Sequence, residues 1–76
     1  MAKLPILNSK QIRRALERGG FTFVRQAGSH ARFIHPDRKS LVTIPMHNKD
    51  IKPKTLKSII GQSGLSLDEF LELLNR

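Results

Sequence analysis

The chain has 76 residues, of which 38% are hydrophobic, and this is the size and composition of one small soluble domain. A domain this short has no room for a separate cofactor-binding domain or a deep substrate cavity. The sequence contains no cysteine, which excludes disulfides, thiolate catalysis and thiolate metal sites. We therefore expect a single domain over residues 1–76, with a core at about residues 9–64 and an acidic C-terminal helix at residues 66–75.

The chain is strongly basic, and its charge is unevenly distributed. Lys and Arg number 14 against 6 Asp and Glu, which gives a formal net charge of +8 and a sequence pI near 11.0. Asp68, Glu69 and Glu72 lie near the C-terminus, so the positive charge is concentrated in residues 1–64. A compact basic body is typical of proteins that bind a phosphate backbone. A solvated basic surface and an acidic protein partner are the alternatives.

The N-terminal residues 1–7 have a short apolar patch that Pro5 interrupts, and they lack the long apolar region of a signal peptide. No other run approaches the ~20 apolar residues of a membrane-spanning helix. Small secreted domains usually need disulfides, and this sequence provides none. We expect a cytoplasmic protein that does not associate with membranes.

The first expected element is a helix that begins after Asn8 or Ser9 and ends at the glycine pair of residues 19–20. Gln11 follows Asn8 by three residues, which is the spacing of a capping box. Three strands are then expected at residues 21–26, 30–35 and 40–44, because these runs are rich in β-branched and aromatic residues. Short turns between them predict an antiparallel meander.

Two further helices are expected after the strands. Pro53 suits the first position of the second helix, which Gly61 or Gly64 ends. Ser66 and Glu69 form a capping box for the third helix. The resulting order, αβββα plus a short C-terminal helix, predicts an α+β fold with helices packed on one face of a three-stranded antiparallel sheet. Double-stranded-RNA-binding domains share this order, an analogy that concerns fold alone.

Alternation along the second strand divides its side chains between two faces. Ala31, Phe33 and His35 are expected to face the helices, and His30 and Arg32 to project from the open face. His30 follows the turn of residues 27–29 directly, with Arg25 close in the sequence. An imidazole can transfer a proton near neutral pH while guanidinium groups bind phosphate, so this set is compatible with ribonuclease chemistry. A turn-capping or solvated histidine is the alternative.

Metal binding is not expected. The sequence has three histidines and six carboxylates, and no carboxylate pair has the spacing of a two-metal nuclease. His30 and His35 are five residues apart and are expected to face opposite ways, which disfavours a shared ion. His47 lies in the loop after the third strand, where it is either an ordinary loop residue, a phosphate ligand or a second proton carrier.

Several segments together resemble the HicA (YcfA-like) toxin family, over roughly residues 9–71. They are Gly20-Phe21, Arg25-Gln26-Ala27-Gly28-Ser29-His30, Val42-Thr43-Ile44-Pro45-Met46-His47, Ile51-Lys52-Pro53, Thr55-Leu56 and Ile59-Ile60. The G-S-H and P-x-H elements and the K-P-x-T-L helix start occur in the family's order. Lys54 departs from the pattern, because the family commonly has glycine there, but lysine is compatible with a helix start.

The resemblance implies a double-stranded-RNA-binding-like fold and a metal-independent mRNA interferase, an endoribonuclease that needs no cofactor. It also implies single-stranded mRNA as substrate, and a HicB-type antitoxin that neutralises the toxin in a hetero-oligomer. The family's catalytic histidine, in G-S-H, corresponds to His30. The residues that we expect to contact RNA are Arg25, Ser29, Arg32, Lys39, His47, Lys49 and Lys52. The main alternative is a non-catalytic basic RNA-binding module; a helix-turn-helix DNA binder is disfavoured because three strands separate the first two helices.

Overall fold

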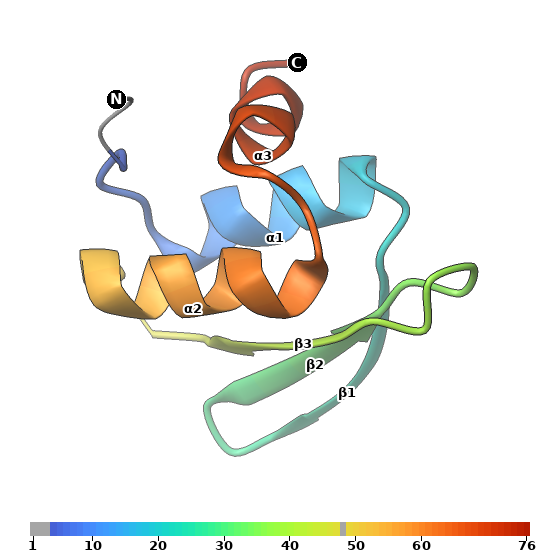
Figure 1. The fold of residues 1–76 in the computed structure, drawn as a ribbon. Helices are drawn as coiled ribbons and strands as arrows, with labels where there is room; N and C mark the ends of the chain where they lie inside the picture. The colour runs from blue at the N-terminus through green and yellow to red at the C-terminus, as the bar shows by residue number, and fades with distance from the viewer. Residues whose placement is uncertain (1–3, 48) are drawn as a thin grey trace.

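The computed structural model describes residues 4–47 and 49–76, and it confirms the predicted α+β order (Figure 1). The strands form one antiparallel sheet in the order β1-β2-β3. The elements are α1 (Ser9–Arg18), β1 (Thr22–Ala27), β2 (His30–Ile34), β3 (Leu41–Pro45), α2 (Pro53–Ser63) and α3 (Leu67–Leu74). No helix among the described residues is long and apolar enough to cross a membrane.

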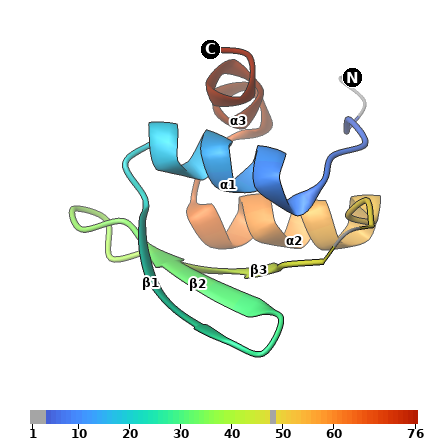
Figure 2. The same cartoon turned by 180° about the vertical axis from the view of Figure 1, so that it is seen from behind.

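The helices leave one face of the sheet open. Figures 1 and 2 show α1 and α2 on the same side of the sheet, with α3 lying across α1 on the side away from the strands. Helices α1 and α2 both pack against β3, whereas α3 packs against α1. Strand β1 lies at the far edge and is exposed along its whole length. The third helix therefore forms an additional layer instead of covering the sheet directly.

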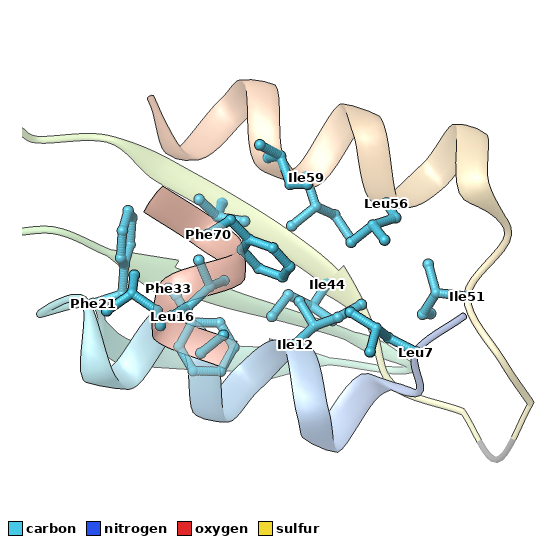
Figure 3. Close-up of a cluster of buried hydrophobic side chains, with 14 of the residues drawn as sticks. Leu7, Ile12, Leu16, Phe21, Phe33, Ile44, Ile51, Leu56, Ile59 and Phe70 are labelled. Carbon is cyan, nitrogen blue, oxygen red and sulfur yellow. The ribbon is translucent and has the colours of Figure 1, made fainter. Parts of the chain in front are cut away.

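The hydrophobic core lies between the sheet and the helices (Figure 3). Its largest fully buried side chains come from every helix, from β2 and β3, and from the segment between α1 and β1. They are Ile12, Leu16, Phe21, Phe33, Val42, Ile44, Leu56, Ile59 and Phe70. A bridge between Leu7 and Ile51 joins the segment before α1 to the loop before α2. The core thus fixes the chain on both sides of the β3–α2 loop.

The predicted helix ends are confirmed. The Asn8 side chain accepts a hydrogen bond from the Gln11 N–H at 2.9 Å, and the Gln11 side chain accepts one from the Asn8 N–H at 3.0 Å. Asn8, and not Ser9, is therefore the N-cap of α1. Helix α2 begins at Pro53 and ends before Gly64, and a second reciprocal box joins Ser66 to Glu69.

The strand limits differ from the predicted ones by one residue. Strand β1 begins at Thr22 because Phe21 is almost completely buried and serves as a core residue between α1 and the sheet. Strand β2 ends at Ile34 instead of residue 35. Strand β3 includes Pro45, which pairs with His30. Proline is tolerated there because β3 is an edge strand whose outer side needs no N–H donor.

Candidate active site on the open face of the sheet

The register of β2 determines which side chains occupy the open face. Ala31 and Phe33 are fully buried against the helices, while His30 and Arg32 are exposed. Because successive side chains of a strand point to opposite faces, His30 and Arg32 project from the side without helices. The predicted orientation of His30 is confirmed.

A β-bulge in β1 brings Arg25 to the same face. The register shifts between Phe23 and Arg25, so that Phe23 pairs with Phe33 and Arg25 pairs with Arg32. Without the bulge, strict alternation would place Arg25 on the same side as Phe23, facing the helices. The bulge instead leaves Val24 without a residue partner and sets the two arginines side by side across the strands.

The turn before His30 lies against the P-x-H segment. Gly28 adopts a positive φ of 60°, which glycine takes without the steric penalty of a side chain. The Met46 N–H donates a hydrogen bond to the Ser29 carbonyl, and Pro45 pairs with His30 across β2 and β3. The structure therefore brings together two motifs that are separated by some fifteen residues in the sequence.

His47 is exposed and held by backbone contacts. Its Nδ1 accepts a hydrogen bond from the Lys49 N–H at 3.2 Å, and its own N–H donates to the Ser9 hydroxyl at 3.3 Å. It borders a hollow of about 320 Å³ that four more polar side chains also line. The residues lining the hollow are Pro45, His47, Lys49, Asp50, Ile51, Lys52 and Thr55.

The predicted site residues fall into three groups. Arg25, Ser29, His30 and Arg32 lie together at the β1–β2 end of the sheet. His47, Lys49 and Lys52 surround the neighbouring hollow, which includes the Pro45 partner of His30. Lys39 stands apart in the turn between β2 and β3. That turn is at the opposite end of β2, roughly 13 Å from His30 by the rise of a strand.

The charges at the site are free of carboxylate partners within the described residues. The ion pairs among the described residues join Arg13 to Glu17 at 3.6 Å and Arg76 to Glu72 at 3.0 Å. Both pairs lie on helices, and neither includes Arg25 or Arg32. The imidazole of His30 forms no hydrogen bond to any residue that the structure describes. Over the same residues, no three His, Cys, Asp or Glu side chains come together in a possible metal site.

Two residues acquire a role that the sequence did not reveal. The guanidinium of Arg13, on α1, lies 5.4 Å from the ring centre of Phe23 and 5.3 Å from that of Phe33. Ser9 was considered only as a helix cap, and its hydroxyl bonds instead to Pro45, at the end of β3, and to His47 in the following loop. Two capping residues in succession were the available signal, because only one of them can be the N-cap.

A protein-family model described as HicA toxin of bacterial toxin-antitoxin matches residues 9–65 of the 76-residue chain. The chain belongs to the HicA toxin family. No curated protein gives a significant match. The family match extends from the first residue of α1 to just beyond α2, so it includes the whole sheet and all of the predicted site residues. Helix α3 lies outside the matched range.

Proposed function

We propose that this HicA-family toxin is a metal-independent mRNA interferase of the cytoplasm in which His30 is the catalytic residue. The observation that carries the proposal is the position of His30 on the open face. It is exposed, it pairs with Pro45 of the P-x-H segment, and it begins strand β2, directly before Ala31 and Arg32. The functional unit that we propose is one domain comprising the whole chain, residues 1–76.

The proposed chemistry needs no metal ion, and water exchanges the proton that His30 does not transfer. The RNA 2′-hydroxyl attacks the adjacent phosphorus, the O2′–P bond forms and the P–O5′ bond breaks. A proton leaves the 2′-oxygen and another reaches the 5′-oxygen, which gives a 2′,3′-cyclic phosphate and a 5′-hydroxyl. His30 transfers one of these protons as general base or general acid, a role that contributes about 10²–10⁴-fold to a rate.

The paired arginines favour the binding of an anion next to His30. Arg25 and Arg32 lie directly opposite each other on neighbouring strands. Like charges in that arrangement destabilise a sheet, and a bound phosphate between them would offset the repulsion. Their guanidinium groups can also stabilise the negative charge that develops on the phosphate oxygens during the reaction. We therefore assign the scissile phosphate to Arg25, Arg32 and His30, with Ser29 beside them.

The remaining basic residues extend the proposed RNA path. Lys49, Lys52 and His47 lie around the hollow next to Pro45, where they can bind phosphates on one side of the cleavage point. Lys39 is too distant to contact the same phosphate, and it would contact the RNA backbone further along the sheet. Such contacts hold the backbone of a single-stranded RNA without reading its sequence.

Cleavage of a long single-stranded RNA in the presence of EDTA tests this function. We expect products with 2′,3′-cyclic phosphate ends. The matched control is the same RNA with 2′-O-methyl groups, which lacks the nucleophile and should bind without being cut. Binding of the unmodified RNA without cleavage would favour the alternative function, a basic RNA-binding module, and would contradict catalysis by His30.

The proposed antitoxin is a HicB-type protein that covers His30. Exposed apolar side chains, among them Val24 and Leu41, lie on β1 and β3 near the arginines, and a mixture of apolar area and charge is typical of protein interfaces. A net charge of +8 also attracts an acidic partner by electrostatic steering. Purified antitoxin should displace labelled RNA stoichiometrically from the inactive His30→Ala protein. A stable complex containing both RNA and antitoxin would contradict occlusion.

A further inference from the structure

Ser9 carries a buried hydroxyl that its own helix does not use. Its side chain is 3% exposed, and the N-cap role at α1 belongs to Asn8. The Ser9 hydroxyl donates a hydrogen bond to the Pro45 carbonyl at 2.6 Å and accepts one from the His47 N–H at 3.3 Å. One side chain thus joins the start of α1 to the carbonyl of Pro45, the last residue of β3, and to the N–H of His47 in the following loop.

The segment from Pro45 to His47 is held from two sides. Ser9 binds the backbone at Pro45 and His47, and the Ser29 carbonyl binds the N–H of the intervening Met46. Ser29 immediately precedes His30, so the same three-residue segment connects the Ser9 hydroxyl to the proposed catalytic turn. A shift of this segment would change the placement of His47 relative to that turn.

The ring of His47 is also oriented. Its Nδ1 accepts the Lys49 N–H, so the neutral ring carries its proton on Nε2. Besides the larger hollow already described, a second hollow of about 180 Å³ borders the ring and is lined by Asn8, Ser9, Lys10 and His47. The Nε2–H group forms no hydrogen bond to the residues that the structure describes, and the exposed imidazole has basic residues on both sides.

We propose that Ser9 is a positioning residue, which holds the Pro45–His47 segment so that Nε2 of His47 donates a hydrogen bond to an RNA phosphate next to the one cleaved at His30. The inference rests on the proposed ribonuclease function. Ser9 itself contacts no substrate, since its hydroxyl is buried and engaged by the loop backbone. Its effect on cleavage acts through His47.

The chain offers a matched control for the loss of a buried serine. Ser63 is fully buried, its hydroxyl donates to the Ile60 carbonyl, and it accepts the Leu65 N–H at 3.1 Å. It lies at the C-terminal end of α2, about 15 Å along the helix from the end that faces the His47 loop. Ser9→Ala and Ser63→Ala therefore remove the same kind of bridge, one beside the proposed site and one away from it.

The test compares single-turnover RNA cleavage by wild type, Ser9→Ala, Ser63→Ala, His47→Ala and the Ser9→Ala/His47→Ala double variant. We expect both serine variants to lower the melting temperature, and only Ser9→Ala to slow cleavage, by about tenfold, because small misplacements of a binding group strongly reduce rates. Ser9→Ala should have no further effect in the His47→Ala background, since coupled residues are not additive. His47→Ala should reduce cleavage less than His30→Ala does.

The spectroscopic readout is the ¹⁵N spectrum of the His47 imidazole. Wild type and Ser63→Ala should show one tautomer, protonated at Nε2, and Ser9→Ala a mixture of the two. Ser9→Cys, which keeps the volume but bonds weakly, replaces Ser9→Ala if the latter does not fold.

Equal loss of cleavage in the two serine variants, or a further loss in the double variant, would overturn the role of Ser9. A wild-type chain that cuts no RNA would overturn the proposed function alone. In that case the ¹⁵N spectrum of the His47 imidazole tests the role of Ser9. An unchanged tautomer in Ser9→Ala would overturn the positioning role.

Discussion

The two ends of β2 each carry a histidine, and the two side chains are used differently. His35 follows the strand, and its Nδ1 accepts backbone N–H groups from Asp37 and Arg38, both at 3.2 Å. Its ring packs edge-on against the buried Phe21, with the ring centres 5.2 Å apart. His30 begins the strand, is exposed, and has an imidazole without hydrogen bonds to the described residues.

The difference contrasts a histidine that stabilises the fold with the exposed histidine that we propose for proton transfer. The Nδ1 of His35 accepts hydrogen bonds within the β2–β3 turn and its ring contacts Phe21 of the core, so both the nitrogen lone pair and the ring are already engaged. Over residues 4–47 and 49–76, neither nitrogen of the His30 ring has a hydrogen-bond partner, and the strand that carries the ring is fixed by the buried Ala31 and Phe33. A proton carrier needs free nitrogens on a rigid support, and of these two histidines only His30 meets both conditions.

Substitution of His30 should have the largest effect on activity. His30→Ala removes the proposed proton carrier, so RNA cleavage and growth inhibition should fall by about 10²-fold or more. The circular dichroism spectrum should stay native-like because the side chain is exposed and packs against nothing in the core. Cleavage within tenfold of wild type would show that His30 is not the catalytic group.

Substitution of His35 should show the opposite pattern. His35→Ala removes two hydrogen bonds and an aromatic contact, which should lower the free energy of unfolding by about 1–2 kcal/mol. Urea denaturation measures this loss. Cleavage per folded molecule should stay close to wild type. A variant of normal stability that no longer cuts RNA would remove the distinction between the two histidines.

The arginines should affect the salt dependence of binding more than folding. The logarithm of the RNA association constant should fall with the logarithm of salt concentration, at a slope of about −2 to −4 for three to six phosphate contacts. Arg25→Ala and Arg32→Ala should each reduce the slope by about 0.7. Arg76→Ala is the control, because Arg76 lies beyond α3 and pairs with Glu72. A slope near zero in wild type would show that the positive charge does not serve RNA binding.

The smallest expected effect is at α3, away from the histidines. The pKa of Glu69 lies below its ordinary value of 4.5, first because the Ser66 N–H donates to its carboxylate and then because of the Ser66 hydroxyl. A lowered pKa in the folded state contributes stability above pH 4.5 that is lost as the pH falls through the lower, folded-state pKa.

Glu69→Gln should therefore flatten the acid limb of the stability curve slightly, measured by urea midpoints between neutral and acidic pH. RNA cleavage at neutral pH should be unchanged. An acid limb identical to that of wild type would show that the capping carboxylate contributes no pH dependence.

The parts of the structure that sequence predicted well depend on local signals. Asn8 with Gln11 and Ser66 with Glu69 are three residues apart, so each capping box is visible in the sequence and forms within one helical turn. The exposure of His30 followed from simple alternation along a short strand. Lys39, in the β2–β3 turn, was grouped with the other basic residues for its charge, although this turn follows the end of β2 that is opposite to His30.

The features that sequence did not predict depend on distant partners. The bulge that turns Arg25 to the open face exists only in the pairing of β1 with β2. Leu73 is buried because α3 lies close over Gly19, where a Cβ would be 2.8 Å from the Leu73 Cδ1. Ser9 finds its partners 36 and 38 residues away. No local pattern encodes such contacts.

The most direct test of the account follows the three histidines at once as RNA binds. The chain contains three histidines, so ¹⁵N-histidine labelling should give three assignable imidazoles. Titration with a 2′-O-methyl RNA, which cannot be cleaved, should shift the His30 signals most and the His47 signals next, and leave His35 unchanged. Shifts at His35 with none at His30 would contradict the claim that the active site lies on the open face of the sheet, at the N-terminal end of β2.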